Sequence, residues 1–263
     1  AAVGVLAPAG APPLLGGAQA QAALAAGGAL TPQDGFRVVN TMGRLMHEQG
    51  VGGQLVYPHV APDWRPDPGK KTELLVTAQT IDARQGCHLK LSIDLGGMLV
   101  LAGNEAGLAA FEAAVPRVED RFPIRLPNHA AFHTPLMEPV AENGRGLLSS
   151  EMLAQPDRPL IDGRGHVWWP GASSLAAMWD YTLGAQVTAP YDFTAAIRTA
   201  AREFAPDLFI VTGPGTTLGG AVAHSLIQCN WRGLADRAGF DATQAEAGLL
   251  VAMGRPDQRA TVT

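Results

Sequence analysis

The sequence predicts an α/β fold, with a parallel-sheet core interrupted by an inserted ferredoxin-like subdomain. Segments with the two-residue alternation of strands and segments with the 3.6-residue spacing of helices follow one another along most of the chain. Such alternation favours a parallel sheet covered by helices. Between residues 53 and 126 the order is instead β-α-β-β-α-β, the ferredoxin-like pattern. We therefore expect residues 1–52 and 130–263 to form the core and residues 53–129 to form the insert.

The first 30 residues carry no charged side chain and consist mostly of Ala, Gly, Leu, Pro and Gln. They lack the basic start and compact apolar stretch of a secretory signal. Prolines and glutamines interrupt the weakly apolar run, which argues against a membrane span. We expect a low-complexity tail up to about Gly17, followed by a helix of Ala and Gln.

A second helix is predicted from Thr31 to Gly50. Thr31 is a typical N-cap residue, Pro32 suits the first helical position, and Asp34 places a carboxylate in the first turn. Gly50 is a typical helix stop. Apolar residues recur between these ends at helical spacing and predict the buried face: Phe36, Val39, Met42 (or Gly43) and Met46.

The insert follows this helix. Gly96 and Gly97 form a hairpin turn in which glycine supplies the positive φ. The predicted strands of the insert are residues 53–58, 88–94, 98–102 and 121–126, and its helices are residues 71–83 and 104–115.

The second half of the core alternates helices and strands again. Trp168 and Trp169 lie in an aromatic loop, and we expect them to pack against the protein rather than bind a ligand. Beyond Arg232 the pattern fades, and we expect the chain to fray. The predicted helices are residues 135–148, 173–183, 191–204 and 216–227, and the predicted strands are residues 159–161 and 207–212.

Composition excludes several classes of function. A net charge of -5 in 263 residues gives no electrostatic reason to expect nucleic acid or an anionic membrane as partner. Cys87 and Cys229 are the only cysteines, too few for a disulfide framework, and no metal-type spacing links them to histidines. We expect a cytoplasmic protein without a metal ion.

His133 is the strongest candidate for chemistry. It lies in the short connection before the helix that opens at Pro135, and loops held by rigid elements often carry catalytic groups. Neutral imidazole is a natural general base near pH 7. A hydrogen-bonded structural histidine is the alternative reading.

Three stretches of sequence resemble the malonyl-CoA:acyl carrier protein transacylases. They are FHTPLM at 132–137, APYDF at 189–193 and FIVTGPGTTLGG at 209–220, in the order and spacing of that family, within a resemblance that covers roughly residues 22–228. Enzymes of this family move an acyl group from coenzyme A to the phosphopantetheine thiol of acyl carrier protein. The resemblance implies an α/β-hydrolase-like acyltransferase core with a ferredoxin-like insert. It also implies acyl-CoA and acyl carrier protein as partners, and no cofactor besides the coenzyme A thioester substrate.

The resemblance also assigns roles to residues. His133 matches the family's general base, and Asp192 falls where the family supplies the main-chain carbonyl that orients the histidine. Gly213 and Gly215 match a turn near the site, and Asn128 is a further substrate-binding candidate.

The helix predicted at residues 31–50 bears on which acyl group the enzyme would accept. Malonyl-specific members carry an arginine that grips the free carboxylate, and this position is Met42 here. Arg44 and Arg37 are the nearest arginines. An uncharged acyl group or an alternative arginine thus becomes possible.

The resemblance fails at the nucleophile. The family has a serine in a G-x-S-x-G turn, which exposes the hydroxyl to the acyl carbonyl. The matching position is Gly17, no serine precedes Ser92, and the glycine-rich oxyanion loop has no counterpart. We expect an N-terminally incomplete or altered member, and disfavour Cys87, Ser92 and Asp94 as replacement nucleophiles. Two functions stay open: an acyltransferase of fatty acid or polyketide synthesis, and an inactive remnant or carrier-protein-binding module.

Overall fold

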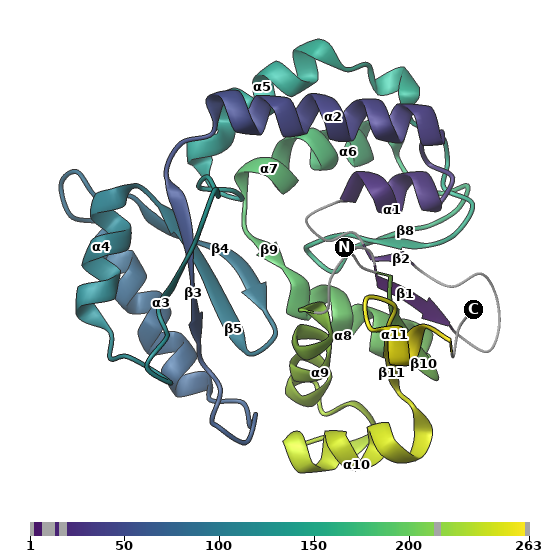
Figure 1. The fold of residues 1–263 in the computed structure, drawn as a ribbon. Helices are drawn as coiled ribbons and strands as arrows, with labels where there is room; N and C mark the ends of the chain where they lie inside the picture. Colours follow the sequence, from purple (N-terminus) through teal and green to yellow (C-terminus); the bar gives the residue numbers. More distant parts are fainter. Residues whose placement is uncertain (1–2, 7–13, 16–19, 213–216, 261–263) are drawn as a thin grey trace.

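A computed structural model describes residues 3–6, 14–15, 20–212 and 217–260 of this chain. Two sheets lie side by side in Figure 1, the smaller one with α3 and α4 and the larger one between two groups of helices. Helices α1, α2, α5 and α6 lie on one side of the larger sheet, and α8, α9 and α10 on the other. None of the helices in the described ranges combines the length and the apolarity needed to cross a bilayer.

The larger sheet is mixed, with strand order β11-β10-β1-β2-β7-β8. Only β2–β7 and β10–β11 are parallel pairs; the pairs β1–β10, β1–β2 and β7–β8 are antiparallel. The expected parallel sheet is therefore wrong in part. A few residues separate β7 from β8, and a parallel pair needs a crossover of a dozen or more. The strands are β1 (Val3–Leu6), β2 (Leu14–Leu15), β7 (Leu160–Ile161), β8 (Val167–Trp168), β10 (Leu208–Val211) and β11 (Leu250–Ala252).

Both predicted tails contain regular structure. Strands β1 and β2 fall within the stretch predicted as a low-complexity tail, of which Gly17 lies outside the described residues. After Arg232 the chain forms α10 (Arg237–Ala247), β11 and α11 (Pro256–Arg259) instead of fraying. Asp236 caps α10 through Gly239 N (2.9 Å), and Gly248 ends it in the left-handed conformation, so the local signals for this helix were present in the sequence.

Helix α2 (Pro32–Gln49) begins as predicted, because the Thr31 side chain accepts a hydrogen bond from Asp34 N (3.1 Å). Its buried face is different. Val38, Met42 and Leu45 are buried, whereas Phe36 is 72% exposed. A 3.6-residue spacing fits more than one face of this helix, and packing against α1 and α5 selects one of them.

The remaining core helices cover the larger sheet. The predicted helix 173–183 is two elements, α6 and a π-helical turn at Tyr181–Ala185. Helices of the core are α1 (Ala20–Ala26), α5 (Glu138–Leu147), α6 (Leu175–Asp180), α7 (Gln186–Thr188), α8 (Phe193–Phe204) and α9 (Leu218–Gln228), with 3-10 turns at Pro135–Met137, Ser150–Met152 and Trp231–Gly233.

The segment predicted as an insert has the element order β-α-β-β-α-β and the strand order β6-β3-β5-β4, with all three neighbouring pairs antiparallel. A two-residue strand of the core, β9 (Tyr191–Asp192), joins its edge by parallel pairing with β4. The elements are β3 (Gly53–Pro58), α3 (Pro68–Asp82), β4 (Leu89–Leu95), β5 (Met98–Gly103), α4 (Glu105–Ala114) and β6 (Ile124–Leu126).

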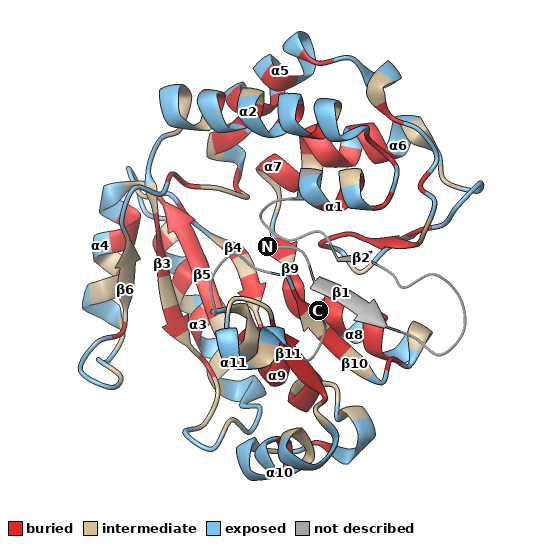
Figure 2. Cartoon of the chain, turned by 45° about the vertical axis from the view of Figure 1, so that its right-hand side comes forward, coloured by how far each residue is buried: buried red, intermediate tan, exposed pale blue. Residues whose placement is uncertain are grey.

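Buried apolar residues form three clusters (Figure 2). One lies around α8, α9, β10 and β11, and a second joins α1, α2 and α5 to the π-helical turn. The third lies entirely within residues 53–129 and includes Leu55, Phe111 and Leu101. Trp168 belongs to the second cluster, so its predicted packing role is confirmed; Trp169 is 49% exposed and lies against Phe204.

Candidate active site

His133 is held by two consecutive carbonyls of α7. Its ring Nδ1 lies 2.6 Å from Gln186 O, and its backbone N–H donates to Val187 O (3.1 Å). A carbonyl can only accept, so Nδ1 carries the proton and the neutral ring keeps its lone pair on Nε2. Nε2 has no hydrogen-bond partner among the residues that the structure describes. This is the tautomer that a general base needs.

The surroundings keep this imidazole neutral. Burial lowers the pKa of His133, and the hydrogen bond to Gln186 opposes that effect in part. The ring also lies beside Tyr191, with 5.8 Å between the ring centroids. At neutral pH His133 is therefore able to accept a proton.

Asp192, expected to mark the orienting carbonyl, has a different place. Its carboxylate accepts a hydrogen bond from Ala195 N (2.7 Å) and caps α8, and its own N–H donates to Gly163 O (2.7 Å). Burial raises the pKa of Asp192. The structure thus gives the orienting contact to Gln186 rather than to Asp192. A backbone carbonyl leaves no signature in a sequence, although the π-helical turn before Gln186 belongs to a class often found at functional sites.

The predicted substrate residues that the structure describes have three different surroundings. Met42 is 2% exposed and its sulfur packs where a side chain at Gly144 would lie, so it fills the core between α2 and α5. Arg44 is exposed and pairs with Glu48 across 3.8 Å. Asn128 has a left-handed backbone (φ 58°) and lines a surface cavity between α2 and the histidine loop. Gly213 and Gly215 lie outside the described residues.

The disfavoured nucleophiles are engaged elsewhere. Ser92 is fully buried, donates to Phe132 O (2.7 Å) and accepts from Gln54 Nε2 (2.7 Å). Asp94 is paired with Lys71. Cys87 lies on the insert before β4, packed against the insert's own core. None of the three combines an exposed reactive atom with a strand–helix turn.

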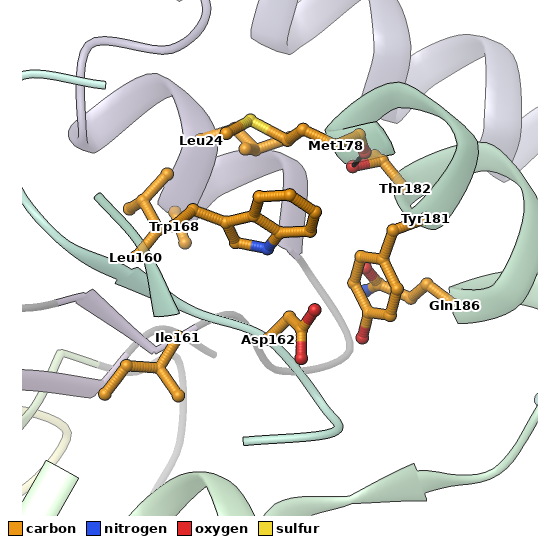
Figure 3. Close-up of a pocket in the computed structure, with 10 residues that line it drawn as sticks. Leu24, Leu160, Ile161, Asp162, Trp168, Met178, Tyr181, Thr182 and Gln186 are labelled. Atoms are coloured by element: carbon orange, nitrogen blue, oxygen red, sulfur yellow. Dashed lines mark hydrogen bonds between the residues drawn. The ribbon is translucent and has the colours of Figure 1, made fainter. Parts of the chain in front are cut away.

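A small cavity is lined in part by Gln186, the residue whose carbonyl holds His133 (Figure 3). Its wall is mostly apolar, and the side chains of Asp162, Tyr181 and Gln186 face the same space. Asp162 is held by the Arg164 guanidinium (2.5 and 3.1 Å), and the Tyr181 hydroxyl accepts from Gly163 N (2.8 Å). Asp162 and Tyr181 are thus already hydrogen-bonded to the protein.

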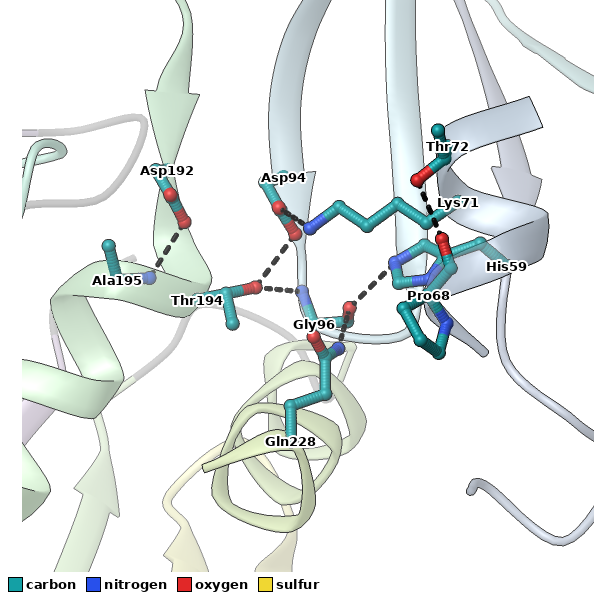
Figure 4. Close-up of polar contacts among 10 residues, drawn as sticks. All are labelled: His59, Pro68, Lys71, Thr72, Asp94, Gly96, Asp192, Thr194, Ala195 and Gln228. Atoms are coloured by element: carbon teal, nitrogen blue, oxygen red, sulfur yellow. Dashed lines mark hydrogen bonds and ion pairs between the residues drawn. The ribbon is translucent and has the colours of Figure 1, made fainter. Parts of the chain in front are cut away.

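A buried polar junction joins the insert to the core (Figure 4). Thr194, in the first turn of α8, donates to Asp94 Oδ1 (2.8 Å) and accepts from Gly96 N (3.0 Å). Lys71 pairs with the other oxygen of Asp94. The carbonyl of Gly96 receives hydrogen bonds from Gln228 of α9 and lies 3.0 Å from His59 Nε2. These contacts tie the β4–β5 hairpin to α8 and α9.

Across the described ranges, no group of three or more His, Cys, Asp or Glu side chains is arranged to hold a metal ion. Gln186, Gln54, His129 and Tyr191 are the residues around His133 that sequence reasoning did not single out.

The chain resembles a polyketide synthase in sequence and acyltransferases in structure. No family model matches it. It is 28% identical over 192 residues, 73% of this chain, to the polyketide synthase GfsB from Streptomyces halstedii, and it spans only 3% of that synthase.

Comparison with solved structures identifies the fold. FabD from Acinetobacter baumannii matches with a TM-score of 0.67 and 18% identity, over 92% of this chain and 68% of FabD. A malonyl-transacylase in complex with its type II polyketide acyl-carrier protein matches with a TM-score of 0.66 and 18% identity, over 92% of this chain and 68% of that one. The acyltransferase domain of the second salinomycin synthase module matches with a TM-score of 0.64 and 22% identity, over 90% of this chain and 48% of that one. The chain therefore has the fold of the malonyl-CoA:acyl carrier protein transacylases, and the resemblance inferred from its sequence is confirmed at the level of the fold.

Proposed function

We propose that this chain is an acyltransferase of the malonyl transacylase type. It moves a malonyl or other short acyl group from coenzyme A to the phosphopantetheine thiol of acyl carrier protein, in fatty acid or polyketide synthesis. The observation that carries this proposal is the imidazole of His133, which donates through Nδ1 to Gln186 O and keeps Nε2 available. A neutral imidazole in this tautomer suits deprotonation of an acyl-accepting nucleophile.

In the proposed reaction, His133 takes the proton of the nucleophile as that atom attacks the thioester carbonyl. The carbon–sulfur bond then breaks, and the coenzyme A sulfur leaves with the proton held by His133. In the second half, His133 accepts the proton of the carrier-protein thiol as the sulfur attacks the carbonyl of the acyl-enzyme. The bond between the acyl group and the nucleophile then breaks, and the nucleophile takes the proton back from His133. The position that matches the family's nucleophile is Gly17, which has no nucleophilic side chain and lies outside the described residues, so this reaction needs a nucleophile from elsewhere.

The acyl group is the less specified part of the proposal. The position expected to hold a carboxylate-gripping arginine is Met42, which is buried in the core. Arg44 is the nearest arginine that could act instead, and it is exposed and paired with Glu48. We therefore propose uncharged short acyl groups alongside malonyl, with Asn128, Gly213 and Gly215 as remaining substrate-binding candidates.

The division of the chain belongs to the same proposal. We assign residues 53–129 to a ferredoxin-like inserted subdomain and residues 1–52 and 130–263 to the acyltransferase core. The strand order β6-β3-β5-β4 and the separate apolar cluster around Leu55 and Phe111 support this division. A cytoplasmic location, and partners limited to acyl-CoA and acyl carrier protein, complete the proposal.

A second function is favoured by one observation. The first serine in the chain, Ser92, is fully buried with its hydroxyl engaged in two hydrogen bonds. Without another nucleophile the chain would be a carrier-protein-binding module or a catalytically inactive relative. Loss of a nucleophile removes most of the reaction rate but leaves the binding surfaces in place.

The test is acylation followed by intact-mass spectrometry. The purified chain is incubated with malonyl-CoA and, separately, with acetyl-CoA, alongside His133→Ala and Gly17→Ser variants. An adduct that forms in the parent chain and is lost in His133→Ala supports the acyltransferase. An adduct only in Gly17→Ser supports an inactive scaffold that keeps its base. No adduct in any folded variant, with carrier protein still bound in a titration, supports the binding module.

A further inference from the structure

A directed chain of hydrogen bonds links the insert to the loop that carries His133. Ser92 Oγ lies 2.7 Å from Phe132 O, Gln54 Nε2 lies 2.7 Å from Ser92 Oγ, and His129 Nδ1 lies 2.6 Å from Gln54 Oε1. Gln54 is 3% exposed and Ser92 is fully buried. The mechanism above uses none of these three side chains.

The donor-to-acceptor direction of these three hydrogen bonds follows from counting protons. Phe132 O can only accept, so the single hydroxyl proton of Ser92 points to it. Ser92 then accepts from the Gln54 amide NH₂, which leaves the Gln54 carbonyl oxygen to accept from His129 Nδ1–H. Each of these three contacts pairs one donor with one acceptor, and hydrogen bonds in such a series strengthen one another in a buried environment.

Ser92 contacts the peptide group that joins Phe132 to His133. The carbonyl of this peptide, Phe132 C=O, accepts from Ser92, while its N–H, on His133, donates to Val187 O (3.1 Å). Because a peptide group is planar, fixing both ends fixes its orientation. His133 also has a left-handed backbone (φ 59°), which a residue with a side chain keeps only where its surroundings hold it.

Strand β4 is irregular at Ser92, the residue that makes this contact. The pairing of β4 with β5 shifts register between Leu91 and Ile93, so Ser92 is the extra residue of a β-bulge. Bulges re-aim side chains and occur next to active sites. Gln54 reaches Ser92 from β3 across the intervening β5, where its paired residue is the small, buried Ala102.

We propose that Ser92 and Gln54 are positioning residues for His133, through which the insert sets the orientation of the imidazole on the core. Gln186 O holds the ring on one side, and Ser92 holds the preceding carbonyl on the other. The inference rests on the proposed role of His133 as the base.

The test observes the ring itself, by NMR of protein labelled with ¹⁵N-histidine. The His133 signals are assigned by their loss in His133→Ala. In the parent protein at pH 7 we expect the Nδ1–H tautomer and slow exchange of that proton with water. In Ser92→Ala we expect a mixture of tautomers and an exchange rate about tenfold faster, because the loss of one hydrogen bond loosens the loop.

A matched control separates positioning from general destabilisation. Ser225 is also a fully buried serine whose hydroxyl donates to a backbone carbonyl, Ala221 O (2.8 Å), but it lies in α9. Ser225→Ala should lower the free energy of unfolding by a similar amount and leave the His133 signals unchanged. Ser92→Thr, which keeps the hydroxyl, should restore the parent tautomer.

The proposal is overturned if Ser92→Ala changes the His133 tautomer and proton exchange no more than Ser225→Ala does. Should Ser92→Ala not fold, Gln54→Met takes its place, since it keeps the length of the side chain and removes the donor to Ser92. Unchanged His133 signals in Gln54→Met would then overturn it. The spectrum reports the orientation of the ring whether or not an acyl adduct forms, so the inference and the proposed function can fail separately.

Discussion

At the scale of single residues, His133 combines backbone strain with burial. A non-glycine residue in the left-handed region costs about 1 kcal/mol or more, and φ at His133 is 59°. The contacts to Gln186 O and Val187 O, with the Ser92 contact one peptide earlier, offset this cost. Strain retained at a buried imidazole points to a constraint on where that ring must lie.

The titration of His133 gives the first prediction. Because burial lowers the pKa of His133, we expect its ring to titrate below the 6.5 of an unperturbed histidine and to be neutral at pH 7. NMR titration of ¹⁵N-histidine-labelled protein measures this value, with the urea-unfolded chain as the reference. A midpoint at or above the unfolded value would contradict a buried, neutral base. Any acyl transfer should weaken as pH falls through the measured value.

At the scale of elements, the junction of Figure 4 decides how the insert sits on the core. The hydroxyl of Thr194 bridges two groups of the β4–β5 hairpin, accepting from Gly96 N (3.0 Å) and donating to Asp94 (2.8 Å). Thr194, Asp94 and His59 are all buried. A buried network of this kind fixes one placement of the insert relative to the core. Any other placement would leave buried polar groups without hydrogen-bond partners, and each such group costs desolvation free energy.

Thr194→Val should therefore destabilise the protein by about 2 kcal/mol, since it leaves the buried Gly96 N–H without an acceptor. Thr182→Val is the matched control, because the buried Thr182 hydroxyl donates only to Met178 O (2.7 Å) within its own helix. Urea unfolding followed by circular dichroism measures both. Equal losses in the two variants would mean that the junction adds nothing beyond a local hydrogen bond.

The separate core of the insert gives another prediction. Phe111 is fully buried and meets Tyr57 edge to face, with ring centroids 5.9 Å apart. Phe111→Ala should cost about 3–5 kcal/mol, because it opens a cavity at the centre of that core. Leu147→Ala, at a position 52% exposed on α5, should change stability by less than about 0.5 kcal/mol. The free energy of unfolding in urea tests both, and a small loss for Phe111→Ala would show that the insert core is loosely packed.

At the scale of the whole molecule, two buried histidines meet where insert and core join. His59 follows β3 and His224 lies on α9; within the described part of the chain, the Nδ1 atom of each is buried without a hydrogen-bond partner. Both face the Gly96–Gly97 turn, and Trp64 lies over His224 at 4.5 Å between ring centroids. Burial lowers the pKa of His59; Asp94 opposes this effect and Lys71 adds to it.

This pair predicts acid lability. Burial, with the nearby His59, lowers the pKa of His224 to about 4 from 6.5. Between these values the unfolded chain binds a proton that the folded chain does not, so stability falls as pH drops from 6.5 and levels off below about 4. The full loss would be on the order of 3 kcal/mol.

Urea unfolding at a series of pH values between 4 and 7.5 measures this dependence. His224→Phe should flatten the fall in stability, because phenylalanine cannot take a proton. Ser225→Ala, the neighbouring buried control, should lower stability at every pH without changing the slope. A parent-like slope in His224→Phe would assign the acid lability to other groups.

Much of the fold was predictable because its signals are local. Thr31 and Gly50 bound a helix that the structure has, and the alternation between residues 53 and 126 gave the β-α-β-β-α-β order. The buried face of α2 was not predicted, and β8 lies where the sequence predicted an aromatic loop. One periodicity fits more than one helix face, and a two-residue strand forms only where it meets a partner strand.

Of the candidate site, the sequence alone singled out His133 as a candidate, because its motif is one contiguous segment, and it showed that no serine precedes Ser92. Only the tertiary structure decided which carbonyl holds the ring, that Met42 lies in the core, and that Gln54 and Ser92 reach the histidine loop. These contacts join residues 38 to 53 positions apart, and two of the three end on backbone carbonyls, which every residue has. Side-chain identity and spacing record what a segment can form, whereas the partner of a carbonyl or a buried hydroxyl is fixed only when distant segments pack together.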